Sequence, residues 1–86
     1  LGEKMYLHIG KNCVIKDSKV IGIFNLEKIE NTPEYKKLYE ELESQKKIED
    51  ISCNQRNSFI LTEENGNFKG YISNIGTNTM KKRKII

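Results

Sequence analysis

The sequence is short of the residues from which most catalytic and metal sites are built. Its 86 residues include one histidine, His8, and two cysteines, Cys13 and Cys53, forty positions apart. His8 has no serine or cysteine beside it in a nucleophile–base pattern, so we expect a partly buried, hydrogen-bonded side chain. A zinc site made from His8, Cys13, Asp50 and Cys53 is conceivable, but the usual close Cys-x-x-Cys spacing is missing, and we expect no metal.

Other absences narrow the class further. Two cysteines are too few for a secreted disulfide scaffold of this size, and the chain shows no signal peptide and no apolar run of membrane length. We therefore expect reduced, packed thiols in a cytoplasmic protein without a membrane partner. The glycines match neither the dinucleotide nor the Walker phosphate motif. We expect no enzyme, no cofactor and no small-molecule substrate.

The length of the chain and its charge distribution indicate how it is organised. There is room for one domain, expected over residues 5–84, and residues 1–4 read as an N-terminal extension or a cloning remnant. Hydrophobic residues make up only 36% of the chain. The core is therefore thin, and self-association would add burial. The net charge of +3 is divided into +2 over residues 1–26, −3 over 27–50 and +4 over 51–86, which suits a two-faced module.

The first third of the chain is β in character. Residues 5–9 alternate apolar and polar side chains, and Gly10-Lys11-Asn12 can reverse the chain into a second strand over 13–15. The near-continuous apolar run 20–24 is typical of a central strand, in which Gly22 indicates a bulge or a close backbone approach. Residues 26–31 are expected to form a short charged connection.

One clear helix follows. Thr32 can cap its free amides and Pro33 suits the first helical position, while the pattern ends near Lys46. An apolar stripe at helical spacing consists of Tyr35, Leu38, Tyr39 and Leu42. Ion pairs four residues apart are expected on the other face, Lys37 with Glu41 and Glu43 with Lys47.

The second half returns to β. It predicts a strand over 48–53, a polar turn over 54–57, and two strands over 58–62 and 68–73 joined by a hairpin turn at 64–67. Phe68 and Tyr71 read as hairpin core, although both could stack on bases. Thr77 or Asn78 can cap a last helix over 79–83. The fold class predicted is α+β: a small antiparallel β-rich domain with one main amphipathic helix and a short C-terminal helix.

Basic residues remain as the candidate functional groups. Each alone reads as an ordinary solubility residue, but lysines and arginines clustered at turns can meet phosphates. The candidates are Lys11, Lys16, Lys19, Arg56 and the run Lys81-Lys82-Arg83-Lys84.

Residues 5–10, 20–24, 58–62 and 71–83, in this order, resemble the extracellular matrix regulator family of Firmicutes, RemA and RemB. The resemblance covers residues 5–83, and its opening and ending are closest to the RemB branch. It implies a homo-oligomer, assembled into rings, that binds double-stranded DNA and regulates transcription of biofilm matrix genes. Its rings present arginines to a curved DNA path.

The resemblance also implies where DNA is contacted. One place is the turn before the third strand, which holds Lys19 here, with Lys16 nearby. The other is the turn after the main helix. The family carries two basic residues in this turn, whereas Asn54-Gln55-Arg56 carries one here. Lys11 completes the candidates. The acidic outer face of the helix does not suit a major-groove recognition helix, so backbone contacts are expected.

Two alternatives stay open. The chain could be a protein-interaction module whose strand edges and helix stripe serve self-assembly or a partner, without direct DNA binding. An RNA-binding module is a weaker alternative, because paired surface aromatics are missing. The sequence does not indicate which residues form an oligomer interface.

Overall fold

The structure is a computed structural model that describes residues 5–82 and 84–85. Its strands are β1 (Tyr6–Gly10), β2 (Cys13–Lys16), β3 (Val20–Asn25), β4 (Ile48–Asp50), β5 (Ser58–Glu64), β6 (Asn67–Ser73) and β7 (Lys84–Ile85). Its helices are the 3₁₀ turn η1 (Asp17–Lys19), α1 (Leu26–Ile29), α2 (Pro33–Ser44) and α3 (Thr77–Lys81). The α+β class, with one main helix and a short C-terminal helix, is confirmed.

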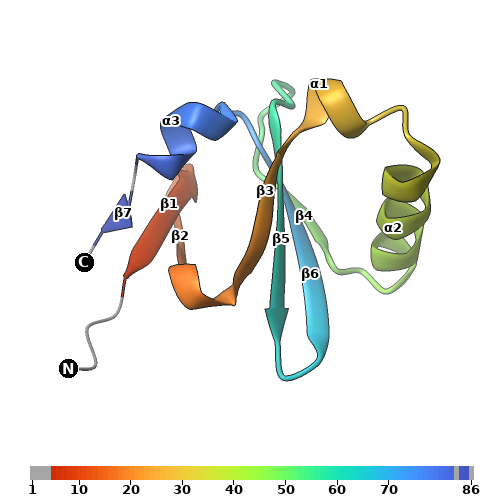
Figure 1. Ribbon diagram of the computed structural model, residues 1–86, viewed down its shortest axis with the longest axis horizontal. Coiled ribbons are helices and arrows are strands. Elements are labelled where there is room, and N and C mark those ends of the chain that lie inside the picture. The colour runs from red at the N-terminus through yellow and green to blue at the C-terminus, as the bar shows by residue number, and fades with distance from the viewer. Residues whose placement is uncertain (1–4, 83, 86) are drawn as a thin grey trace.

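The elements form three layers (Figure 1). The central layer is a four-stranded sheet in the order β3-β5-β6-β4. Helix α2 covers one face, and a small sheet in the order β2-β1-β7, together with α3, covers the other. One core cluster lies against the small sheet and contains Leu7, Ile9, Ile51, Ile60, Tyr71 and Met80. The second lies under α2 and contains Leu26, Tyr35, Leu42, Phe59 and Ile72.

Both predicted hairpins are confirmed. β1 pairs antiparallel with β2, and the turn between them places Lys11 at a positive φ of 45°. β5 pairs antiparallel with β6 through Asn65 and Gly66, whose φ angles are 54° and 81°. Two successive positive φ angles are the requirement of a type I′ turn, which explains the Asn-Gly pair.

One strand pair is parallel. β4 runs parallel to β6, with Ile48 opposite Gly70, at the edge of the sheet far from β3. Because β3 and β6 each pair antiparallel with β5, β3 and β4 point the same way. Parallel strands need a long crossover connection, and α1 and α2 provide it. α2 therefore lies across the sheet face.

The prediction that residues 20–24 form a central strand is wrong. β3 is an edge strand whose apolar residues pack on both faces: Val20 and Ile23 against the core under the small sheet, and Phe24, 37% exposed, against Phe59 on the other face. The bulge predicted at Gly22 is confirmed, since the register with β5 shifts between Val20 and Gly22. The bulge leaves Ile21 unpaired and 52% exposed. A Cβ on Gly22 would come within 2.6 Å of the Phe24 ring, so the absence of a side chain at Gly22 leaves room for that ring.

The helix signals were partly correct. Thr32 Oγ1 accepts a hydrogen bond from the Tyr35 amide at 3.2 Å, as expected of the N-cap. The helix ends at Ser44, two residues before the predicted end at Lys46. The charged connection expected over residues 26–31 contains a helical turn, α1, capped by the Asn25 side chain. Leu26 is fully buried, and this apolar anchor explains why the segment is ordered as a helix.

Three further boundaries differ from the prediction. β4 ends at Asp50, not at residue 53. α3 begins at Thr77 with Gly76 as its N-cap, so neither Thr77 nor Asn78 caps it. β7 was not expected and pairs antiparallel with β1.

Ser73 joins the two sheets. Its hydroxyl is fully buried, donates to the Ile9 carbonyl at 2.5 Å and accepts from the Ile75 amide at 3.0 Å. Ser73→Ala removes both bonds and leaves a buried carbonyl without this donor. We expect the free energy of unfolding to fall by about 1–3 kcal/mol. Chemical denaturation measures this free energy, and Ser18→Ala, at an exposed serine, is the control. Equal stability of the two variants would contradict the role of Ser73 in joining the sheets.

Candidate nucleic-acid interface

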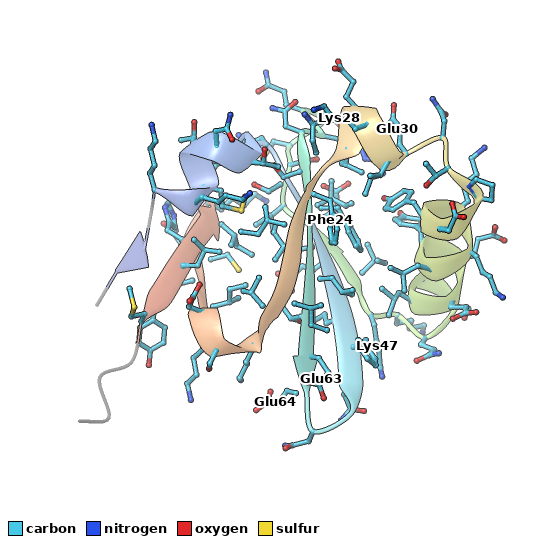
Figure 2. All side chains as sticks on the ribbon, viewed as in Figure 1. Phe24, Lys28, Glu30, Lys47, Glu63 and Glu64 are labelled. Atoms are coloured by element: carbon cyan, nitrogen blue, oxygen red, sulfur yellow. The ribbon has the colours of Figure 1, made fainter. Side chains whose placement is uncertain are left out.

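The four-stranded sheet has two ends, and charged side chains lie at both. We call one the hairpin end, because it holds the β5–β6 turn, and the other the α1 end (Figure 1). Figure 2 shows Lys47, Glu63 and Glu64 at the hairpin end and Lys28 and Glu30 at the α1 end. The candidate DNA-contacting residues divide between these ends.

Lys19 lies at the hairpin end, where η1 leads into β3. Its Nζ forms an ion pair with Glu64 Oε1 at 2.9 Å, with 33% of the Lys19 side chain and 59% of the Glu64 side chain exposed. This hydrogen bond and the Lys19 charge hold the pKa of Glu64 below its usual value, and the charge of Lys16 adds to the effect. An exposed pair of this kind is weak, so a phosphate can replace the Glu64 carboxylate at little cost.

A groove extends from Lys19 along the hairpin end. It has a volume of about 630 Å³ and runs between β2 with η1 on one side and the β5–β6 hairpin on the other. Its charged lining residues are Lys16, Lys19, Lys47, Lys69 and Glu64. Two of these lysines, Lys16 and Lys47, have no ion pair within the described residues, so the groove offers them to an anion.

Lys47 and Lys69 were not among the predicted contact residues. The Lys47 carbonyl accepts a hydrogen bond from the Gly70 amide at 2.9 Å, which sets Lys47 beside Lys69. Lys69 Nζ pairs with Glu49 Oε1 at 2.9 Å, and this bond raises the pKa of Lys69. The parallel β4–β6 register that brings these residues together is not visible in local sequence.

The ion pairs expected along α2 do not form. Among the described residues the ion pairs are Lys19 with Glu64 and Lys69 with Glu49. Lys47 follows the end of α2 and lines the groove instead of pairing with Glu43.

Lys11 and Arg56 lie at the α1 end. Burial alone would raise the pKa of Asp50, but hydrogen bonds from the Ser52 hydroxyl at 2.5 Å and amide at 2.9 Å lower it. The charges of Arg56 and Lys11 lower this pKa further, so both cations lie near one carboxylate. His8 Nε2 lies 2.8 Å from the Lys11 carbonyl oxygen, which confirms the hydrogen-bonded role expected for His8.

The surroundings of Arg56 are acidic. Arg56 is exposed and lines a polar pocket of about 360 Å³ with Glu27 and Glu30. It lies two residues before β5, whereas Lys19 pairs with Glu64 at the other end of β5. Seven residues of extended strand span about 20 Å. Lys19 and Arg56 therefore lie at well-separated places on one subunit.

The C-terminal basic run is divided by the structure. Lys81 ends α3 and Lys82 follows it, both exposed. Lys84 begins β7, and Arg83 lies outside the described residues.

The two aromatic residues of β6, Phe68 and Tyr71, differ from each other in burial. Tyr71 is buried, as expected of hairpin core, but Phe68 is 44% exposed, so the core prediction is wrong for Phe68. Lys69 Nζ lies 4.8 Å from the centre of the Tyr71 ring and already covers it.

The thiols are free, but only one is packed. Cys13 is half-buried, and burial together with the Glu49 charge raises the pKa of its thiol. Cys53 is exposed, which contradicts the prediction of two packed thiols, because it lies in the irregular loop after β4 at a φ of 52°. Within residues 5–82 and 84–85 no three His, Cys, Asp or Glu side chains gather as a metal site, and no helix is long and apolar enough to cross a membrane.

Comparison with known proteins places the chain in a family. None of the curated proteins compared with it matches. Residues 6–83 match the RemA-like family, described as extracellular matrix regulatory protein A-like. The match does not separate RemA from RemB, so closeness to RemB stays a prediction. Since the match covers nearly the whole chain, this protein belongs to the RemA-like family of extracellular matrix regulatory proteins.

Proposed function

We propose that the protein is a non-enzymatic transcriptional regulator of extracellular matrix genes that binds double-stranded DNA as a homo-oligomer. The observation that supports this proposal most directly is that Lys19 and Arg56 both lie in accessible turns rather than in the core. From a turn, a long cationic side chain reaches a phosphate without disturbing the fold. Lys16 and Lys11 add one further cation at each end.

One subunit alone would bind weakly. A few basic groups support non-specific dissociation constants of about 10⁻⁴–10⁻⁶ M. Linked repeats of such a site raise the overall affinity by about 10²–10⁴ without any new contact. Repetition in an oligomer therefore supplies what a single subunit lacks.

The surface offers a route to assembly. β3 is an edge strand with unpaired backbone groups, and it exposes Ile21 and Phe24. An apolar pocket of about 200 Å³ adjoins it, lined by Phe24, Ile29, Leu38 and Leu61 among others. The groove at the hairpin end carries four lysines and the pocket of Arg56 carries Glu27 and Glu30, which allows lysines of one subunit to pair with glutamates of the next. A head-to-tail contact of this kind generates a ring when its rotation closes, and it would bring Lys19 of one subunit towards Arg56 of the next.

The test is binding of the assembled protein to a fluorescently labelled random-sequence duplex at about 50 mM salt, read by anisotropy. We expect saturable binding, because phosphate contacts need no particular sequence. Absence of binding at this salt concentration would contradict the proposal and favour a protein-interaction module.

A further inference from the structure

Helix α2 leaves part of its face of the central sheet uncovered. The helix packs mainly against β6 and β4, on one side of that sheet. On the β3 side, Phe24 is 37% exposed and borders an apolar pocket of about 200 Å³. Ile29 of α1, Leu38 of α2 and Leu61 of β5 also line this pocket. The pocket has room for one aromatic ring, since an apolar cavity of about 150 Å³ binds benzene.

The same face of the sheet carries an exposed aromatic ring. Ile72 belongs to the core under α2, and alternation along β6 puts Phe68 on that face as well. Phe68 is 44% exposed. Leu61 of the pocket pairs with Gly70, so Phe68 is the diagonal neighbour of Leu61 across β5 and β6. An exposed phenylalanine and an apolar pocket therefore lie side by side on one face.

Little charge interrupts this surface. Among the described residues that line the pocket only Glu34 is charged, and it is exposed in the first turn of α2. Glu63 lies opposite Phe68, and its carboxylate accepts a hydrogen bond from the Gly66 amide at 2.8 Å. Phe24 on β3 and Glu63 near the hairpin turn mark the extent of the surface in Figure 2. Its chemistry favours an apolar partner.

The side-by-side arrangement favours a second copy of the chain as that partner. The Phe68 ring of one copy reaches the pocket of another only if the two faces oppose each other. Two copies of one face oppose each other after a half-turn about an axis in the plane of the contact. The second ring then meets the first pocket, which makes the contact isologous. An unrelated partner in the pocket would leave Phe68 exposed, whereas a second copy buries both.

We propose that two copies of this chain pack through the uncovered part of the α2 face, each inserting Phe68 into the pocket of the other. This apolar contact joins subunits in pairs, whereas the end-to-end contact proposed above links them into a ring. The β3 edge, with Ile21, borders this face. The inference deepens the proposed homo-oligomer and rests on self-association, but it does not rest on DNA binding.

The experiment is sedimentation equilibrium of the full chain, without DNA, at about 1 M salt. The Debye length is then about 3 Å, so contacts between surface charges are screened while apolar burial is retained. At high micromolar concentration we expect a mass of at least twice the 10.0 kDa of one chain.

Two variants remove the two halves of the contact. Phe68→Ser should weaken the dimer about 10³-fold, because each of two buried aromatic anchors contributes a factor of about 30. Leu38→Trp fills the pocket from within its own chain, so it should also give a monomer. Val14→Ser, at a residue that is 46% exposed on β2, is the control and should keep the mass of the parent. Thermal melting checks that each variant is folded.

A mixture of the two variants tests the pairing of ring with pocket. Neither variant alone retains a complete ring–pocket contact, but a mixed pair retains one, from Phe68 of the Leu38→Trp chain to the pocket of the Phe68→Ser chain. We therefore expect the equimolar mixture to form dimers, about 30-fold weaker than those of the parent.

Three results would overturn the proposal: a monomeric parent at 1 M salt, an unchanged mass for Phe68→Ser, or a mixture that stays monomeric. The proposed function would fail differently. If the parent assembles and binds duplex DNA at low salt but Phe68→Ser keeps the mass of the parent, only the face-to-face contact is wrong. A parent that is monomeric at low salt as well would contradict the proposed homo-oligomer itself.

Discussion

Lys19→Ala and Arg56→Ala are each expected to weaken binding to duplex DNA strongly while leaving the fold and the oligomer intact. Both side chains lie in turns and take no part in the two core clusters. Each lost phosphate contact flattens the slope of log affinity against log salt by about 0.9. That change is multiplied by the number of subunits touching one DNA, so an assembly amplifies it. Anisotropy titrations at several salt concentrations measure the effect, beside thermal melting and light scattering.

Lys37→Ala provides the matched control for these variants. Lys37 is exposed on α2 and has no ion pair among the described residues. The Lys37→Ala substitution removes one positive charge, as Lys19→Ala does, but at a position away from both ends of the sheet. If Lys37→Ala weakened binding as much as Lys19→Ala, the interaction would reflect net charge alone and the assigned contacts would be wrong.

Glu64→Gln tests the same contact in the opposite direction. In the free protein, the Glu64 carboxylate forms an ion pair with the Lys19 ammonium group at 2.9 Å and so competes with phosphate for that group. Glu64→Gln frees Lys19, so we expect tighter duplex binding than for Glu40→Gln, which removes an exposed charge on α2. Equal gains from both variants would show that only the net charge had changed.

Ile21→Glu is expected to dissociate the oligomer. Native mass spectrometry of the parent protein should show a species well above the 10.0 kDa of one chain. Ile21 is 52% exposed at the bulge of the β3 edge, so a buried charge would appear there only in the assembled state. The variant should lie at the mass of a monomer and lose about 10²–10⁴ in duplex affinity, because avidity is lost.

Val14→Glu is the control for the assembly variant. Val14 is 46% exposed on β2, so the same change of chemistry is made on another edge strand. Its mass should match that of the parent. A monomeric parent at high micromolar concentration would contradict both the oligomer and the avidity argument.

Local signals predicted the elements that local physics controls. Thr32 and Pro33 fixed the start of α2, and Asn65-Gly66 fixed the β5–β6 turn, because cap and turn preferences act over a few residues. The β3 run was misread for a non-local reason. Its apolar side chains pack on both faces, Val20 and Ile23 towards the small sheet and Phe24 against Phe59 on the α2 side, which gives an edge strand the apolar pattern of a central one.

The candidate surface was predictable in part. Basic turns at Lys19 and Arg56 are visible in the sequence, and both residues lie where turns were expected. Their separation by the length of β5 depends on strand pairing, as does the arrival of Lys47 at the groove. The partners Glu64 and Glu49 are distant in sequence from Lys19 and Lys69, so no local pattern marks these pairs.

The most direct test of DNA binding by a repeated basic surface is the salt dependence of duplex affinity for the parent protein. The four predicted contacts, Lys11, Lys16, Lys19 and Arg56, give one subunit a slope of about −3.6 in log affinity against log salt. We predict a steeper slope between about 50 and 200 mM salt, because several subunits contact one DNA. No binding at low salt, or a slope no steeper than about −3.6, would contradict the account.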